Sequence, residues 1–389
     1  MDWVEPDYDG GSIVNLSASL LQSFGVEPPS PACKHIEPQW LSGGRGTVLL
    51  LCDALGRLQL DEALQSRHLP NLARLVEEAA GGLQQLTSIF PSTTTAALTS
   101  INTARPPAEH GLMGMYQWID EVGSVCNMLQ FATLAEKPVF FSEELLRSGP
   151  NIHQLLASRD ISSYVISSAD FEGTAFTGLL HQGAHYSGCI AQSDISHLLA
   201  QSFTQAGDKR SLHYVYWPMV DTIAHHYGPL TEPYLLELEF VDFMLGKVMA
   251  QCAAAGYNLV FTADHGQTYM EPQQAVRVDE DLHGLLRHFP GGGRRAMYLS
   301  TDDKNAVQQV DALQVEGVKI IDTEDAIARG WFGGDCGPYR SRVGDLIVLA
   351  TAERQLLYDY GKGLTLWRGG HASLTAAEML VPLLVRPCD

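Results

Sequence analysis

The stretch TVLLLCDALG, residues 47–56, decides the fold of this chain. It is an apolar run of Val and Leu that ends in one acid, Asp53, and then in Gly56. A run this short and apolar is typical of a strand that is buried on both faces of a sheet. A carboxylate is costly inside such a core unless it has a partner. We therefore expect Asp53 at the carboxyl end of the strand, where open α/β sheets bind their ligands.

The composition limits the partners of the chain. It has 389 residues, of which 45% are hydrophobic and 18% are charged, as is ordinary for a globular protein with a large core. The formal net charge is −20. Nucleic acids and anionic membranes are bound through basic faces, so we expect neither as a partner. A negatively charged substrate would need a local positive centre, such as a bound metal ion.

The sequence shows no targeting signal. The first twenty residues are acidic and lack a basic segment followed by an apolar one, and no apolar stretch approaches the ~20 residues of a membrane span. The seven cysteines are scattered singly, which indicates reduced thiols. We therefore expect a cytoplasmic protein. Its oligomeric state is left open.

The order of patterns predicts one core with an insert. Residues 1–45 are rich in Pro and predict a loop-rich lead over the surface. Strand and helix patterns alternate over 46–270 and return over 361–389, which indicates an α/β fold with a doubly wound, mostly parallel central sheet and helices on both faces. Short patterns over 271–360 predict a small α+β cap subdomain.

Three later segments also end in Asp or His after an apolar run. Asp221 and His225 follow the strand pattern HYVYW, and their i, i+4 spacing on a helical turn would direct both side chains at one point. Asp264 and His265 follow the strand pattern NLVFT, and His371 follows two glycines. Three such segments are hard to explain as surface decoration.

With Asp53, the set contains three carboxylates and three imidazoles. Six such ligands divide naturally into two tetrahedral sites with three protein ligands each, and these sites keep open positions for substrate or nucleophile. The mixture of His and Asp suits Zn²⁺, with Mn²⁺ or Fe as alternatives. The sequence therefore predicts two divalent metal ions.

A cluster of hydroxyls follows the strand pattern that ends at Phe90. Residues 91–101, PSTTTAALTSI, predict a helix that begins within the Ser/Thr run. The start of a helix favours anions, because its first N–H groups lack partners and the helix dipole is positive there. For this segment alone, a helix cap without chemistry is an equal alternative.

At these motifs the chain resembles the type I phosphodiesterase/nucleotide pyrophosphatase family of the alkaline phosphatase superfamily. The resemblance runs from about Val48 to Val385. It rests on Asp-x-x-Gly at 53–56, FPSTT…P-x-x-HG at 90–111, D-x-x-x-H-x-x-G-P at 221–229, ADHG at 263–266 and GGH at 369–371. It implies that 271–360 is a cap over the site.

The resemblance also implies which residues hold each metal ion. One ion takes Asp221, His225 and His371. The other ion takes Asp53, Asp264, His265 and the oxygen of the nucleophile.

The same resemblance selects the nucleophile among Thr93, Thr94 and Thr95. In the family, the nucleophilic Thr lies sixteen residues before the His of the P-x-x-HG element; that His is His110 here, which selects Thr94. The implied mechanism is an in-line displacement that passes through a covalent phosphothreonine.

Two departures from the family concern the substrate. Family members often carry an aromatic residue directly after the nucleophile and an Asn three residues after it; this chain has Thr95 and Ala97. We predict Thr95, Tyr116 and Trp118 as substrate-binding residues. His110 and Phe171 are further candidates, although packing is the simpler role for the aromatic residues.

We therefore predict a metal-dependent phosphohydrolase, a phosphodiesterase or pyrophosphatase that acts on a small organic phosphoester. The alternatives are a phosphonate C–P hydrolase or a phosphomonoesterase on the same scaffold, and a catalytically silent metal-binding protein. The sulfatase motifs Cys-x-Pro-x-Arg and Ser-x-Pro-x-Arg do not occur. Arg294, Arg295 and Arg368 are candidates to meet a charged substrate tail, with solvated surface as the simpler role for each.

Overall fold

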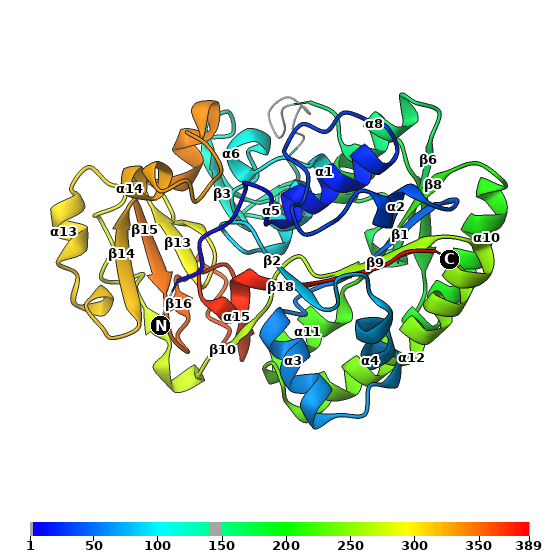
Figure 1. The fold of residues 1–389 in the computed structure, drawn as a ribbon. Coiled ribbons are helices and arrows are strands. Elements are labelled where there is room, and N and C mark those ends of the chain that lie inside the picture. The colour runs from blue at the N-terminus through cyan, green and yellow to red at the C-terminus, as the bar shows by residue number, and fades with distance from the viewer. Residues whose placement is uncertain (1–2, 140–148, 389) are drawn as a thin grey trace.

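The computed structural model describes residues 3–139 and 149–388 and contains a seven-stranded central sheet with helices on both faces (Figure 1). In spatial order the strands are β2 (Gln84–Thr87), β18 (Leu380–Arg386), β9 (Asn258–Thr262), β1 (Gly46–Cys52), β8 (Ser211–Trp217), β6 (Ser162–Ser168) and β7 (His185–Cys189). β1 pairs in parallel with β8 and β9, and β6 pairs in parallel with β7 and β8. β18 is antiparallel to both of its neighbours, β2 and β9. The predicted doubly wound α/β fold is confirmed.

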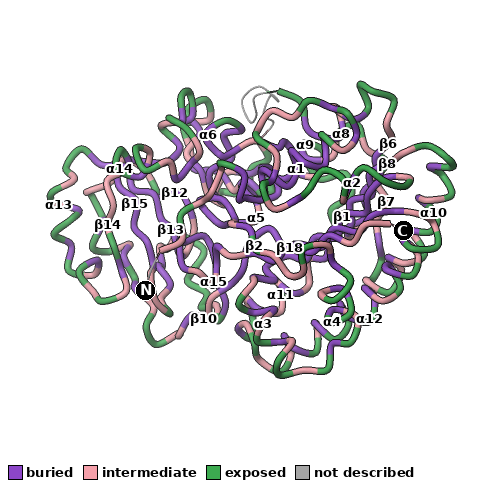
Figure 2. Tube along the Cα trace, viewed as in Figure 1, coloured by how far each residue is buried: buried purple, intermediate pink, exposed green. Residues whose placement is uncertain are grey.

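The central strands are the most deeply buried part of the chain. Every residue of β1 and of β8 is buried, and Figure 2 shows the middle of the sheet in purple. Burial on both faces explains why these strands are apolar runs rather than alternating patterns.

Two groups of helices cover the faces of the sheet (Figure 1). One group is α1 (Ile13–Ser23), α5 (Thr94–Thr103), α8 (Ile152–Ala157) and α9 (Ala175–His181). The other is α3 (Arg57–Ser66), α4 (Pro70–Glu78), α11 (Met219–Tyr227) and α12 (Glu232–Ala255), with α10 (Ile195–Ala206) at the β7 end. No helix within the described ranges has the length and apolar character needed to cross a bilayer.

The short helices lie in the connections. They are α2 (Gln39–Ser42), α6 (Pro107–His110), α13 (Lys304–Gln308), α14 (Thr323–Ala328), α15 (Ala376–Met379) and the 3₁₀ turns η1 (Ala169–Phe171), η2 (Gln192–Asp194), η3 (Pro272–Gln274), η4 (Asp311–Leu313) and η5 (Gly337–Val343).

The N-terminal segment differs from its prediction as a surface lead. Residues 13–21 of α1 are all buried, and the helix packs against α5. The amide of Asn15 explains how the preceding and following loops are fixed, because its Nδ2 donates to the carbonyls of Tyr8 and Pro31. The burial of α1 was not predicted from the sequence, because the helix contains polar residues such as Asn15, Ser17 and Ser19.

A second seven-stranded sheet lies beside the first. Its order is β14 (Val318–Asp322), β15 (Leu346–Ala350), β13 (Ala296–Leu299), β12 (Gly291–Gly292), β3 (Tyr116–Ile119), β4 (Ser124–Asn127) and β5 (Ala132–Thr133). Two small pairs accompany it: β10 (Thr268–Tyr269) with β17 (Gly369–Gly370), and β11 (Val276–Arg277) with β16 (Leu356–Leu357). This sheet therefore also uses strands from 116–133, outside the proposed insert 271–360.

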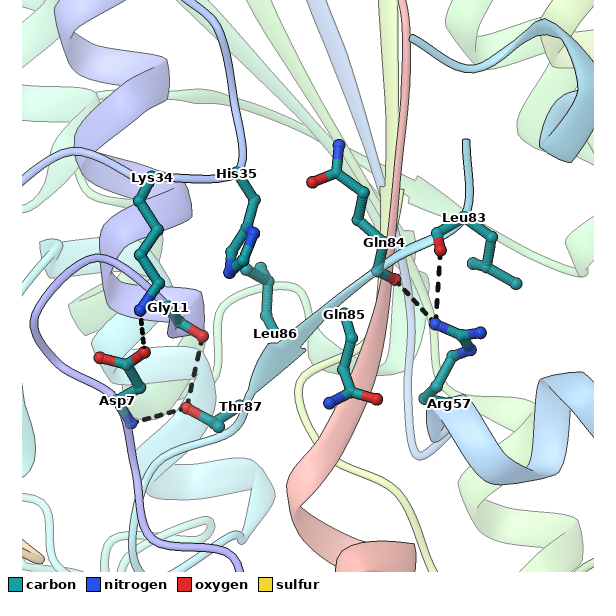
Figure 3. Close-up of a pocket in the computed structure, with 10 residues that line it drawn as sticks. All are labelled: Asp7, Gly11, Lys34, His35, Arg57, Leu83, Gln84, Gln85, Leu86 and Thr87. Carbon is teal, nitrogen blue, oxygen red and sulfur yellow. Dashed lines mark hydrogen bonds and ion pairs between the residues drawn. The ribbon is translucent and has the colours of Figure 1, made fainter. Parts of the chain in front are cut away.

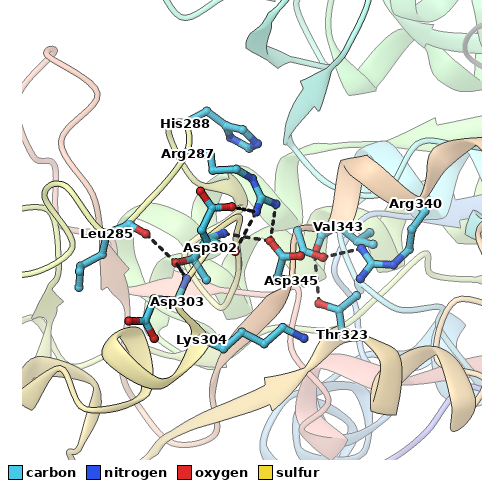
Figure 4. Close-up of polar contacts among 12 residues, drawn as sticks. Leu285, Arg287, His288, Asp302, Asp303, Lys304, Thr323, Arg340, Val343 and Asp345 are labelled. Atoms are coloured by element: carbon cyan, nitrogen blue, oxygen red, sulfur yellow. Dashed lines mark hydrogen bonds and ion pairs between the residues drawn. The ribbon is translucent and has the colours of Figure 1, made fainter.

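Polar contacts hold the loops of this second sheet together (Figure 4). Arg287 donates to a carboxylate oxygen of Asp302 (2.9 Å) and to one of Asp345 (2.5 Å). Asp345 also accepts from the backbone N–H of Thr301 (2.9 Å). One aspartate thus connects the end of β13 with the start of β15.

The strand directions place five segments at one edge of the central sheet. β1, β8 and β9 are adjacent and parallel, so the residues after them emerge together. β18 is antiparallel to β9 and β2, so the chain before β18 and the chain after β2 emerge at that same edge. All the predicted ligands and the hydroxyl cluster lie on these five segments.

Candidate active site

The first group of predicted ligands is Asp221, His225 and His371. Asp221 and His225 lie one turn apart on α11, and His371 lies between β17 and α15. Nε2 of His225 is 3.2 Å from Oδ1 of Asp221, and Nε2 of His371 is 3.6 Å from the same oxygen. One oxygen therefore faces two imidazole nitrogens, as three ligands around one cation require.

The second group is Asp53, Asp264 and His265, all of them buried. Asp53 follows β1, and the other two follow β9. Nε2 of His265 lies 3.6 Å from Oδ1 of Asp53 and 3.4 Å from Oδ2 of Asp264. Ala54 has a positive φ of 59°, and its N–H donates to Oδ1 of Asp264 (3.2 Å). This turn connects the two acids.

The two groups are adjacent, and Thr94 lies beside them. The rings of His265 and His371, one from each group, stack with centroids 3.9 Å apart. Oγ1 of Thr94, the first residue of α5, is 3.2 Å from Nε2 of His265. Thr94 is partly exposed, whereas Thr93 and Thr95 have exposed fractions of 3% and 0%. Of the three threonines, Thr94 is the one that faces the ligand groups.

The donor atoms of the site fit metal ions. Nδ1 of His225, His265 and His371 lies within 2.8–3.0 Å of a backbone carbonyl, to which it donates. The proton is thereby held on Nδ1, which leaves each Nε2 with a free lone pair, as in metal-binding histidines. Oδ1 of Asp53 and Oδ2 of Asp264 are buried and have no hydrogen-bond partner in the described part of the chain. Buried anionic oxygens of this kind require a cation.

The charges of the site lead to the same conclusion. Burial, followed by the charges of Asp264 and Asp221, raises the pKa of Asp53 well above its usual range. Burial acts to raise the pKa of Asp221 as well, but the imidazoles of His225 and His371 outweigh it and lower that pKa. Three carboxylates share one small space, so bound cations would relieve their repulsion.

Two residues that did not emerge from the sequence donate hydrogen bonds to predicted ligands. The hydroxyl of Tyr216 donates to Oδ2 of Asp53, and Nε2 of Gln267 donates to Oδ1 of Asp221. Tyr216 lies at the end of β8, and Gln267 comes two residues after His265. Their positions close to predicted ligands in the sequence were a signal for a role in the site. The acid that each one contacts lies on a different segment, and only the folded arrangement of the strands brings the two together.

The predicted substrate-binding residues lie in two different parts of the structure. Thr95 is fully buried beneath the helix start. Tyr116 and Trp118 lie on β3 of the second sheet, where Tyr116 stacks on Tyr360 (5.2 Å) and Trp118 stacks on His288 (4.0 Å). Within the described residues, no side-chain hydrogen bond, ion pair or ring stack joins any of the three to the ligand groups, so their substrate contacts stay a prediction.

The two further candidates, His110 and Phe171, differ in their surroundings. His110 is completely buried, with its Nε2 2.9 Å from Oγ of Ser100, which favours the packing role. Phe171 is exposed, and its ring lies 6.5 Å from that of Tyr216.

The three candidate arginines differ in burial and in their partners. Arg295 is fully buried and forms an ion pair with Glu378, so its prediction as solvated surface was wrong. Arg368 is exposed and donates to the hydroxyl of Tyr269 (3.4 Å). Arg294 is partly buried and lies over the ring of Trp367, which contacts His225.

A surface cleft of about 490 Å³ lies away from these groups, along the edge strand β2 (Figure 3). Its cations are already occupied: Lys34 pairs with Asp7, and Arg57 donates to the carbonyls of Leu83 and Gln84. No ligand residue lines this cleft. This cleft is therefore separate from the two Asp/His groups.

The structure thus combines an α/β sheet with two Asp/His groups and a threonine at the ends of its strands. The profile of the type I phosphodiesterase / nucleotide pyrophosphatase family matches residues 47–373, and the chain belongs to that family. It is therefore an enzyme, a hydrolase of phosphoester bonds. The predicted family is confirmed. A sequence search of curated proteins gives no match.

Solved structures share the fold. Murine ectonucleotide pyrophosphatase / phosphodiesterase 5 is 16% identical, with a TM-score of 0.67 over 87% of each chain. Phosphonoacetate hydrolase from Sinorhizobium meliloti, in complex with phosphonoformate, is 18% identical, with a TM-score of 0.65 over 89% of this chain and 91% of that chain. The murine protein has also been solved as an inactive threonine-to-alanine form in complex with AMP, at 16% identity and a TM-score of 0.66 over 87% of each chain.

Proposed function

We propose that the chain is a metal-dependent phosphodiesterase or pyrophosphatase that hydrolyses a small organic phosphoester, with Thr94 as the nucleophile. One observation carries this proposal. The hydroxyl of Thr94 lies 3.2 Å from a ligand of the second group, which stacks on a ligand of the first. The inactive threonine-to-alanine form of the murine relative agrees with a threonine in this role.

The two Asp/His groups would each hold one divalent ion, most simply Zn²⁺. Bound ions would neutralise the phosphoryl oxygens and favour the ionised form of hydroxyl groups close to them. The carbonyl partners of the three imidazoles keep each Nε2 directed at its ion. Gln267 and Tyr216 would fix the orientation of the acids.

The proposed reaction has two displacements at phosphorus. In the first, the Thr94 oxygen loses its proton to solvent and bonds to phosphorus, while the bond from phosphorus to the leaving oxygen breaks and the leaving group takes a proton from water. In the second, a water oxygen bonds to phosphorus, and the phosphothreonine bond breaks to restore the hydroxyl of Thr94. The first N–H groups of α5 lie where they can stabilise the phosphoryl oxygens.

The side chains that follow Thr94 argue against nucleotides as the best substrates. The side chains of Thr95 and Ala97 contain neither a ring nor an amide that could contact a bound nucleotide. Both are also fully buried. We therefore propose a smaller organic group beside the scissile phosphate.

A substrate screen of the metal-loaded protein tests this function. It includes an aryl phosphodiester, an aryl phosphomonoester, ATP, NAD and phosphonoacetate. We expect the diester to be turned over faster than the monoester, ATP or NAD. Preference for phosphonoacetate or for the monoester would replace the proposal by one of the two alternatives on the same scaffold. Retained metal without any turnover would favour a silent metal-binding protein.

A further inference from the structure

Arg294 lies close to the candidate site and has no acidic partner among the described residues. It has no ion pair with any described carboxylate, although the chain has a net charge of −20. Its Nη1 donates to Oε1 of Gln355 (3.1 Å) and to the carbonyl of Thr365. Both contacts are neutral, so they position the guanidinium without compensating its charge. A partly buried charge of this kind favours an anionic ligand.

The position of Arg294 connects it with the first ligand group. Its Cζ lies 4.4 Å from the centroid of the Trp367 ring. The same ring lies 4.3 Å from the ring of His225. The indole of Trp367 therefore lies between the guanidinium and His225, a predicted metal ligand. A substrate with its phosphoryl group at the metal site would have Arg294 next to that group.

Two tyrosines, Tyr116 and Tyr360, act on the charge of Arg294. Tyr116 and Tyr360 stack on each other at 5.2 Å. Burial lowers the pKa of the Arg294 guanidinium, and these two tyrosines act in the opposite direction. A cleft of about 400 Å³ lies beside Tyr360 and Phe289; Arg294 does not line it.

The free nitrogens of Arg294 have the geometry that an oxyanion needs. Nη1 is used by the protein, whereas Nε and Nη2 make no hydrogen bond with the described residues. These two N–H groups point in parallel on the planar guanidinium and match the two oxygens of a carboxylate or a phosphate. The contact with Trp367 fixes the plane of this fork.

We infer that Arg294 binds a second anionic group of the substrate, a carboxylate or a phosphate, that lies beyond the scissile phosphoryl group. This inference rests on the proposed phosphoester hydrolysis and makes the substrate class narrower: a phosphoester with a charged tail. It also gives a role to Arg294, a candidate arginine that has no acid partner among the described residues.

Steady-state kinetics can test the inference with three 4-nitrophenyl phosphodiesters. Their second ester group is methyl, carboxymethyl or 2-phosphonoethyl, so they differ in the tail alone. Arg294→Gln should lower kcat/KM for the carboxylate tail, the phosphonate tail or both by about 10- to 100-fold, and for the methyl ester by less than about threefold. The charged tail that loses most identifies the preferred anion. Arg294→Lys should recover part of the loss, and the exposed-arginine control Arg159→Gln should match the wild type on all three.

Binding measured by calorimetry separates this inference from the proposed function, because it needs no turnover. The probes are methylphosphonate, 3-phosphonopropionate and methylenediphosphonate with the metal-loaded protein. Arg294→Gln should weaken one or both of the probes with two anionic groups and leave methylphosphonate unchanged. Equal losses on all probes, or no loss on any, would overturn the inference even if the diesters are hydrolysed. Absent turnover with selective loss of these probes would instead remove the proposed function and retain the anion site.

Discussion

Arg295 and Glu378 form a completely buried ion pair that connects the second sheet with the segment that carries His371. Nη2 of Arg295 lies 2.8 Å from Oε2 of Glu378, and Nε lies 3.1 Å from Oε1. Glu378, on α15, also accepts from the N–H of Ser373 (3.0 Å), two residues after His371. The pair therefore helps to fix where the His371 segment lies against the rest of the site.

Removing one partner of this pair should destabilise the protein strongly. Arg295→Leu leaves the carboxylate of Glu378 buried without a cation, and we expect a loss of about 3–5 kcal/mol in the free energy of unfolding. The double variant Arg295→Leu with Glu378→Leu should recover a large part of this loss, because neither charge is then left alone. Denaturant unfolding of the metal-free protein measures both. A loss below about 1 kcal/mol for the single variant would show that solvent reaches the pair.

Metal removal should abolish activity and show two distinct sites. A chelator should remove two ions per chain, measured by elemental analysis, and re-addition of Zn²⁺ should restore turnover. His371→Ala should empty the first site preferentially, whereas Asp53→Ala should affect the second. Less than one ion per chain after reconstitution with Zn²⁺ or Mn²⁺ would contradict the two-ion account.

The hydroxyl of Tyr216 should tune the second site without binding the ion itself. Tyr216→Phe removes the donor to Oδ2 of Asp53 and keeps the packing of the ring. The expected effect is a loss of about 10- to 100-fold in metal affinity at that site, as is typical when a partner of a ligand is lost. Competition with a calibrated chelator measures the affinity, and the first site serves as the internal reference. An unchanged affinity would show that this hydrogen bond does not orient Asp53 for the ion.

The buried His110 should make stability fall in acid. Burial lowers the pKa of His110 to about 3, far below the value of about 6.5 in an unfolded chain. Between these values the unfolded state binds the additional proton, so the free energy of unfolding falls as pH falls, by up to about 1.4 kcal/mol per pH unit. His110→Gln should remove this part of the slope between pH 6 and pH 4.5, whatever it costs in packing at pH 7. An unchanged slope for the metal-free variant would contradict a neutral, buried His110.

Much of the site was predictable because its signals are local. Each of Asp53, Asp221 and Asp264 comes directly or within a few residues after an apolar strand, and adjacent parallel strands bring such residues to one edge. The i, i+4 spacing of Asp221 and His225 also predicts a shared point without any knowledge of the fold. The α/β core followed from the same alternation of strands and helices.

The rest depends on contacts between distant segments, which local patterns do not contain. The stack of His265 on His371 needs the pairing of β10 with β17 as well as the order of the central strands. The burial of Arg295 was missed because its partner Glu378 is 83 positions away. Likewise, nothing in residues 116–133 indicated that β3, β4 and β5 would join strands of 291–350.

The most direct test of the central claim is the turnover of one aryl phosphodiester by Thr94→Ala at matched metal content. The account predicts a loss of at least about a thousandfold, with the fold and most metal binding retained, because attack and its orientation are lost together. Thr93→Ala and Thr95→Ala are the matched controls, since both side chains are buried beside Thr94 and should affect stability more than rate. Thr94→Ser should keep measurable activity. A Thr94→Ala rate close to that of the wild type would contradict the account, and activity in all three alanine variants would replace Thr94 by water as the nucleophile.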